Sequence, residues 1–552
     1  MLHSLFPSAG WRLAGCLLLW GLGVVTWSRA ATPEQFSGES AKWQHYQSPN
    51  FELYSGNTDR ESRDLLFKLE VLRAIFMDRV KLKEKRPLPV TIYFFRTEKT
   101  FRGYTPEVYQ QNDSYVGYYI ARPDRAVIAM APADDDKRAQ QVIFHEYIHH
   151  LMKVTEQNPP AWYNEGMAEI YSTIQFDEGK VELGHPAAGR LYELQQKKML
   201  PLEQLFATTN GSSVFTQSNH TGTFYAQSWA LLHYCYFGQS DISREKFDLF
   251  LRVAAAPKYA DPVKLREICQ ELLGLDYPRL NEELDNYVRN GRYRYVAFPQ
   301  PAVAAGKTYA MRVVSTEEIH NRLAELEFRI NNTGRARLAM LQLAERSPAD
   351  PRPHEVLGSQ ALLEGDFVRA REIWSKAIDL GSQNPAIFHE LAQLESQQWF
   401  SRVDLYFRLP DDLATHLRDL LHRSIKVAPR QSAAYELLAW VEATAKEPEI
   451  ANINLVQEHF PEITDKKRSL LALALVRWRK DDPTTAISIL DKLANMEPDA
   501  WMKSGAETLR AKIEGRSPVR SAPDGSKRPQ IKVRPIKPPP IKLPMSKPPT
   551  GS

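Results

Sequence analysis

Two histidines four residues apart, with a glutamate directly after the first, constrain this chain more than any other feature. His145, Glu146 and His149 stand in the segment 141–152, whose apolar residues predict a buried helix. In such a helix positions 145 and 149 lie one turn apart on one face, so both imidazoles can reach one metal ion. Glu146 is rotated by about 100° from His145. It can therefore act on a water molecule beside the metal without being a ligand.

A catalytic zinc ion usually takes three protein ligands and leaves a further position open. The segment 160–169 reads Pro-Ala-Trp-Tyr-Asn-Glu-Gly-Met-Ala-Glu, and we expect a second helix from about Trp162. In that helix Glu165 and Glu169 lie at i and i+4, again on one face. Glu165 would complete a His, His, Glu ligand set. Glu169 could accept the free N–H of a ligand histidine and fix the orientation of its ring.

The two motifs together resemble those of the gluzincin metallopeptidases, whose second motif also carries an acidic residue four positions after the ligand glutamate. Within that group the chain is similar to bacterial peptidase MA-like domains. These share a Ser-Pro-x-Phe-Glu-Leu segment, matched by residues 48–53, and a Tyr-x-Gln-Ser-Trp-Ala segment, matched by residues 225–230. The resemblance covers about residues 43–295. It implies an α+β zincin-like fold, a Zn²⁺ cofactor and peptide hydrolysis with Glu146 as general base.

The resemblance also suggests further site residues. Gluzincins use a tyrosine or histidine to hydrogen-bond the oxyanion that forms at the attacked carbonyl. Tyr225 is the first candidate and His220 the second, with a purely structural role as the alternative for each.

A strand is expected at 126–130, directly before the helix that carries His145 and His149, which we call the metal helix. This strand would line the cleft and pair with the substrate backbone, or else be a core strand. The chain lacks the Gly-x-Met-Glu-Asn segment of gluzincin aminopeptidases, which favours an endopeptidase. Only 15 residues separate His149 from Glu165, unlike the best-known gluzincins, so subsite details do not transfer.

From about residue 317 the pattern changes to helical repeats. A leucine followed by alanine or glycine recurs every 34 residues at 323, 357 and 391, and again at 438 and 473 after an insertion around 397–415. This is the period of tetratricopeptide (TPR) repeats, which the segment resembles. The resemblance implies an all-α solenoid over 317–513 with a concave face that binds a protein partner. A purely structural spacer is the alternative.

The two ends of the chain predict its compartment. Arg12, an apolar run over 13–27 and Ser28-Arg-Ala30 form a secretory signal over 1–30, cleaved after Ala30. An uncleaved anchor is the alternative, although the run is shorter than the roughly 20 residues that span a bilayer. The tail 516–552 carries nine Lys or Arg and one Asp, is rich in proline and should be disordered. Its charge of +8 could hold it to an anionic membrane or the cell envelope.

These patterns together predict a mostly helical exported protein with a metallopeptidase domain over 40–298, followed by the repeats and the tail. The predicted function is a bacterial periplasmic or cell-envelope zinc peptidase that acts on proteins or peptides and recruits a partner through its repeats. The alternative is a non-catalytic periplasmic TPR scaffold with a vestigial peptidase fold. Nucleic acid is not expected as a partner, since the net charge is only +4 and the basic tail lacks aromatic residues for base stacking. Substrate, repeat ligand, oligomeric state and any pairing of Cys235 with Cys269 stay open.

Overall fold

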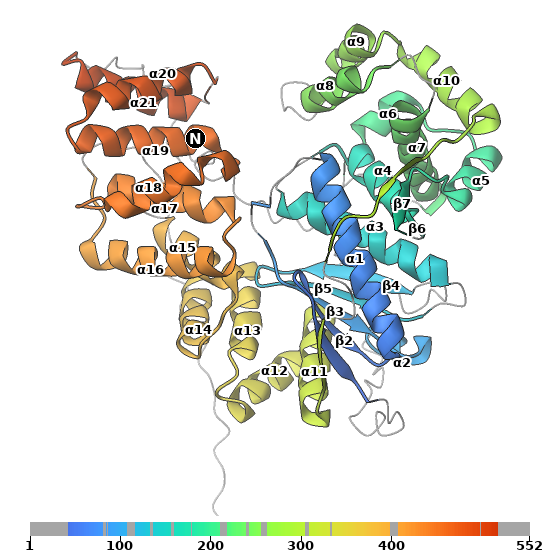
Figure 1. The fold of residues 1–552 in the computed structure, drawn as a ribbon, viewed down its shortest axis with the longest axis horizontal. Coiled ribbons are helices and arrows are strands. Elements are labelled where there is room, and N and C mark those ends of the chain that lie inside the picture. Colours follow the sequence, from blue (N-terminus) through green and yellow to red (C-terminus); the bar gives the residue numbers. More distant parts are fainter. Residues whose placement is uncertain are drawn as a thin grey trace, which may run out of the picture.

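The computed structural model describes residues 42–516 apart from 81–83, 86, 107–115, 133–135, 156–158, 178, 210–217, 239–241, 255–261, 304–308, 332–333, 398–406, 497 and 499. The predicted signal at 1–30 lies outside the described residues, as does the tail after Arg516. Within the described part the chain is mostly helical, with two small sheets (Figure 1). No helix in this part is both long and apolar enough to cross a bilayer. Cys235 and Cys269 are both buried free thiols.

The larger sheet has six strands in the order β4-β5-β3-β2-β1-β9. Their bounds are β1 Gln44–Gln47, β2 Phe51–Ser55, β3 Val90–Phe94, β4 Gly117–Ala121, β5 Ala126–Met130 and β9 Ala310–Val313. The pairs β2–β3 and β3–β5 are parallel, and the other three are antiparallel. β4 and β5 form a hairpin through residues 122–125, where Arg122 N–H donates to the Arg125 carbonyl at 2.9 Å.

Ten helices and a second sheet complete the part of the chain before residue 300. The helices are α1 Asp59–Val80, α2 Glu98–Arg102, α3 Asp136–Val154, α4 Ala161–Ser172, α5 Ala188–Gln196, α6 Leu202–Ala207, α7 Ser218–Phe237, α8 Arg244–Ala254, α9 Pro262–Leu273 and α10 Tyr277–Asn290. The second sheet joins β6 Gln175–Asp177, β7 Lys180–Leu183 and β8 Val296–Pro299 in that order. In the described part of residues 175–207, two strands and two helices follow α4.

The larger sheet is covered on both faces. Side chains alternate along each strand, so Phe51 and Leu53 join α1 and α3 in the main core, while Tyr54 points the other way. Tyr54 belongs to a second core with Tyr93 and Leu323 of the later helix α11. The sheet is therefore a shared layer between the helices that precede residue 300 and those that follow it.

The helices after the sheet form one continuous array (Figure 1). They are α11 Thr316–Asn331, α12 Gly334–Arg346, α13 Arg352–Leu363, α14 Phe367–Asp379, α15 Pro385–Ser396, α16 Asp411–Val427, α17 Ser432–Thr444, α18 Ile450–Glu458, α19 Lys466–Arg479, α20 Pro483–Ala494 and α21 Ala500–Ile513. Consecutive helices pack on each other except α18 and α19, where α19 packs on α17 instead; the contacts are most extensive in the pairs α13–α14, α15–α16 and α19–α20. Within α13–α14 a Cβ at Gly358 would overlap the buried Trp374 indole, so this crossing requires glycine.

Candidate metal centre

Helices α3 and α4 lie side by side and bring the predicted ligands together. Ile143, Phe144 and Ile148 anchor α3 in the main core and leave His145 and His149 on the side that faces α4. Glu165 and Glu169 are both buried in α4. The close approach of α4 to the next helix of the core depends on Gly166, because a Cβ there would lie 2.6 Å from the Ser228 carbonyl oxygen of α7.

Three electron-pair donors of this interface meet at one point. The Nε2 atoms of His145 and His149 are 3.1 Å apart, and Glu165 Oε2 lies 3.4 Å from the first and 3.3 Å from the second. Ligands held about 2.0–2.1 Å from a tetrahedral zinc ion are separated by about 3.3 Å. Glu165 Oε2 is buried without a hydrogen-bond partner. The residues therefore fit a small divalent cation, and among the described residues this is the one cluster that does so.

Glu169 lies behind His145, as the sequence predicted for a ring-orienting carboxylate. Its Oε1 is 3.3 Å from His145 Nδ1 and accepts a hydrogen bond from Arg190 Nη2 at 2.7 Å. Arg190 stands on α5, and its guanidinium lies over the Tyr225 ring, 5.3 Å from the centroid. A chain of contacts thus runs from Tyr225 through Arg190 and Glu169 to a ligand histidine.

The pKa values of these groups show how strongly they attract one another. Burial is the largest single influence: it lowers the pKa of each histidine and raises that of each carboxyl group. The contacts across α3–α4 outweigh it, so the pKa of His145 rises to about 10, that of His149 also rises, and those of Glu165 and Glu169 fall to about 2. Both glutamates are thus carboxylates at neutral pH, and a bound cation would displace protons from the two histidines.

Glu146 and Tyr225 lie beside the three converging atoms, His145 Nε2, His149 Nε2 and Glu165 Oε2, which we call the ligand triangle. Glu146 is half-buried on α3, and its charge acts on His149 and on the Tyr225 phenol. The Tyr225 ring lies edge-on to the His145 ring at a centroid distance of 6.2 Å. Burial, followed by the charge of Glu165, raises the pKa of Tyr225, which therefore keeps its proton. The side chain of His220, the second candidate for this role, lies outside the described residues.

The expectation for the strand at 126–130 was wrong in one respect. That strand, β5, is hydrogen-bonded on both sides, to β3 and to β4, and its five residues are all buried. It is thus the core strand of the two alternatives. In the described part of the chain the free edge nearest α3 belongs to β4, where a Cβ at Gly117 would come within 2.9 Å of Ile143 Cδ1.

His150 is a buried residue of α3 that contacts β4. It is 1% exposed, and its Nδ1 shares a hydrogen bond of 2.9 Å with the Tyr119 hydroxyl of β4. Burial, aided by the charges of Arg73 and Lys153, lowers the pKa of His150 to about 3. The ring is neutral at physiological pH and ties the edge strand to the metal helix.

Arg190 is the residue of this site that sequence reasoning missed. It lies in a segment whose elements we could not assign, 21 residues from the carboxylate that it holds. The one available signal was that Arg190 is a basic residue in a stretch with helical apolar spacing, between the two metal motifs and Tyr225. Such a signal does not specify which residue Arg190 contacts.

Comparisons with known proteins leave the assignment to the geometry of the site. No protein-family model matches the chain, and no curated protein matches it either. Among solved structures it is similar to yeast Tom70, with a TM-score of 0.19 and 10% identity over 70% of this chain and 82% of that one. Similarity at this level does not define a common fold.

Proposed function

We propose that this chain is a zinc-dependent peptidase, with an endopeptidase favoured. The observation that carries the proposal is the triangle of His145 Nε2, His149 Nε2 and Glu165 Oε2, whose sides of 3.1–3.4 Å match the edges of a tetrahedral zinc site. Two histidines and one carboxylate form a ligand set that hydrolytic zinc sites use. When bound there, Zn²⁺ would supply Lewis acidity and favour ionisation of water at neutral pH.

The chain's own residues would carry the proton transfers. Glu146 follows the first ligand directly and has no place in the ligand triangle, so its carboxylate can take the proton of an attacking water and return it to the leaving amine. Tyr225 keeps a phenol hydroxyl that can donate a hydrogen bond to the developing oxyanion. Glu169 would hold the His145 ring in the orientation that points Nε2 at the metal.

A peptide substrate would pair with the outer edge of β4. No strand of the described residues occupies that edge, and an extended peptide can add to a sheet edge through main-chain hydrogen bonds. The contacts of Tyr119 with His150 and of Gly117 with Ile143 keep this edge next to the metal helix. A substrate aligned along β4 would thereby have its scissile bond near the ligand triangle.

We assign the array α11–α21 to a TPR-like solenoid, on the 34-residue period and on the Gly358–Trp374 crossing. Arrays of this kind bind proteins along an extended surface, and a partner or substrate would be recruited there. Export to the periplasm or cell envelope rests on the sequence of residues 1–30.

The proposal is tested by measuring bound zinc and casein hydrolysis for the full chain and its Glu146→Gln variant. We expect one zinc per chain in both proteins and a fall in activity of about 10²–10⁴-fold in the variant. Glu282→Gln removes an exposed carboxylate that pairs with Arg279 on α10 and serves as the matched control; it should change neither value.

Two results would contradict the proposal in different ways. A parent protein that binds no zinc would remove the metal centre. Zinc in every protein with no hydrolysis of casein or other unfolded proteins would support the alternative of a metal-bearing scaffold.

A further inference from the structure

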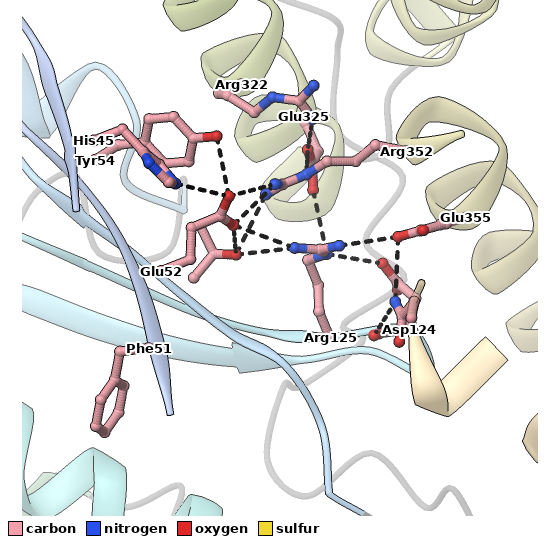
Figure 2. A network of polar contacts seen from close by, with 12 residues as sticks. His45, Phe51, Glu52, Tyr54, Asp124, Arg125, Arg322, Glu325, Arg352 and Glu355 are labelled. Carbon is pink, nitrogen blue, oxygen red and sulfur yellow. Dashed lines mark hydrogen bonds and ion pairs between the residues drawn. The ribbon is translucent and has the colours of Figure 1, made fainter. Parts of the chain in front are cut away.

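Two neighbouring residues of β2 reach opposite faces of the large sheet. Phe51 packs on Tyr147 of α3, with ring centroids 5.0 Å apart, and Tyr147 stands between the two histidine ligands in the sequence. Glu52 points to the other face, toward α11 and α13 of the array (Figure 2). Both belong to the segment 48–53 that the sequence analysis singled out and that the proposed chemistry does not use.

Glu52 is held by one arginine of the array and by polar side chains of the sheet, among them Thr91, whose Oγ1 donates to Glu52 Oε2 at 2.8 Å. Arg352 Nη1, at the start of α13, donates to its two carboxylate oxygens at 3.0 and 2.9 Å, and Arg352 Nε donates to Glu325 Oε2 at 2.8 Å. His45 Nε2 lies 3.2 Å from Glu52 Oε1, and Arg125 Nη1 lies 3.5 Å from Oε2 (Figure 2). The carboxylate thus joins β2 to two helices that follow it by about 270–300 residues.

The turn between β4 and β5 makes the second set of contacts with the array. Arg329 of α11 donates through both terminal nitrogens to the Asp124 carboxylate, and the two side chains are 2% and 0% exposed. Arg125 Nη2 donates to Glu355 Oε2 at 2.9 Å, and Asn384 Nδ2 donates to the Asp124 carbonyl oxygen at 2.8 Å. These bonds join the sheet to α11, α13 and the start of α15.

The charges of this region balance one another. Glu52, Asp124, Glu325 and Glu355 face Arg125, Arg322, Arg329 and Arg352; we call these eight side chains the junction. Burying charges is costly unless each finds a partner. Separating the array from the sheet would leave several of them without one. Domains joined only by a linker normally move relative to one another, and the junction opposes that motion.

A separate contact links the array to the metal helix. Lys85 N–H donates at 2.8 Å to the carbonyl of Val154, the last residue of α3. The Lys85 carbonyl accepts at 3.2 Å from Ala433 N–H in the first turn of α17, and Lys85 Nζ lies 3.5 Å from Glu436 Oε2. One residue therefore touches both the end of α3 and the middle of the array.

We propose that one surface of the array is an intramolecular docking site for the chain's own six-stranded sheet. This surface binds the face of the sheet opposite α1 and α3, and it is formed by Arg322, Glu325, Arg329, Arg352 and Glu355. Through it the array fixes β2 and, by way of Phe51 and Lys85, the position of α3. Phe51, Glu52 and Lys85 are thus positioning residues for the metal helix. A protein partner of the array must bind elsewhere, on surfaces that do not face the sheet.

The proposal does not depend on the metal and is tested by hydrogen exchange of the full chain in increasing urea. We expect β2, β3, α11 and α13 to lose protection together in the parent. In Glu52→Gln all four should open together at a lower urea concentration, and exchange in the second half of α3 should quicken at least tenfold without urea. Opening of α11–α14 well before the sheet in the parent would overturn the proposal, as would unchanged exchange of α3 in the variant.

Two further variants separate positioning from general damage. Arg337→Gln removes a partly exposed pair with Glu364 inside the array and should leave α3 unchanged. Phe51→Leu keeps an apolar side chain and removes the ring contact with Tyr147, so it should quicken exchange in α3 but not in α13. If Glu52→Gln does not fold, Phe51→Leu decides whether β2 positions α3.

Zinc provides an additional measurement. In the parent, added zinc should slow exchange in α3 and α4 and also in α11 and α13. In Glu52→Gln the effect should stop at α3 and α4. Absence of any zinc effect in the parent would count against the proposed metal centre, whereas protection confined to α3 and α4 in the parent would count against the coupling.

Discussion

The candidate metal centre and the junction are both buried clusters of charged side chains, yet they differ in the kinds of groups that face one another. In the junction each carboxylate faces a guanidinium, as in the paired contacts of Glu52 with Arg352 and of Asp124 with Arg329. In the metal centre the converging atoms are two imidazole nitrogens and a carboxylate oxygen, all able to donate electron pairs. The first arrangement satisfies itself with protein groups, whereas the second would gain a common partner from the cation of the proposed function.

The largest expected effect follows from removing one donor of the metal centre. His149→Ala leaves two ligands where catalytic zinc usually has three, so we expect loss of stoichiometric zinc and of hydrolysis. Urea unfolding of the array should not change, because His149 has no part in the junction. His185→Ala is the matched control, since this half-buried histidine pairs with Glu182 and is not one of the three converging ligands. Full activity of His149→Ala would show that the triangle is not the catalytic centre.

The next largest effect is expected in the junction. Asp124→Asn removes the bidentate carboxylate of the buried Arg329 guanidinium, which keeps Glu325 as its remaining acidic partner. Breaking a buried pair costs about 3–5 kcal/mol when a charge is left unpaired, so we expect a cost near the lower end of that range. Urea unfolding should report this as a lower free energy of unfolding, with zinc still bound under native conditions. Asp285→Asn, which breaks an exposed pair with Arg289, should cost less than about 1 kcal/mol. Equal costs for the two variants would mean that the junction is no stronger than a surface ion pair.

A smaller effect is expected for Arg190, which contacts Glu169 and not the ligands themselves. Arg190→Met removes the guanidinium that holds Glu169, which in turn orients His145. Removing a hydrogen-bond partner of a metal-ligating side chain typically lowers metal affinity or activity by about 10–100-fold. Because Arg190 acts on His145 only through Glu169, zinc affinity should fall toward the lower end of that range. Competition with a chelator measures the change. Arg190→Lys should recover part of it, and an unchanged affinity in Arg190→Met would limit Arg190 to contact with Tyr225.

The smallest effect concerns pH. Burial would raise the pKa of Glu52, but Arg352, His45 and Arg125 outweigh it and hold this pKa well below its usual value; Tyr54 also donates a hydrogen bond to this carboxylate. A lowered pKa stabilises the fold above the ordinary glutamate value of about 4.3, and this stability is lost as the pH falls further. The free energy of unfolding of the parent should therefore approach that of Glu52→Gln below about pH 4. A constant difference from pH 7 to pH 3 would contradict this account.

The same contrast explains what the sequence could predict. The convergence of His145, His149 and Glu165 follows from spacings within two helices and one short loop, so local geometry sufficed. The helices of the array followed from a 34-residue period. The pairing of Asp124 with Arg329 spans 205 residues and carries no local signal.

Sheet order was likewise not encoded locally. Residues 126–130 indicated a strand, but whether it lies at the edge or in the centre of the sheet depends on its pairing with β3 and β4. The uninterrupted apolar run Ala-Val-Ile-Ala-Met was the available signal, because central strands buried on both faces read in this way. Arg190 was missed for a similar reason, since its partner lies on another helix.

The place of β9 has a consequence for how the chain folds. This strand closes the sheet beside β1, with Gln44 opposite Val313, although about 270 residues separate the two. Until residues 310–313 are available, β1 is an open edge that can pair with another chain. Synthesis delivers the N-terminal end first, so helices α3 and α4 are present before this edge is protected. Chains cut short before residue 310 should therefore aggregate, even though every ligand of the metal centre is present in them.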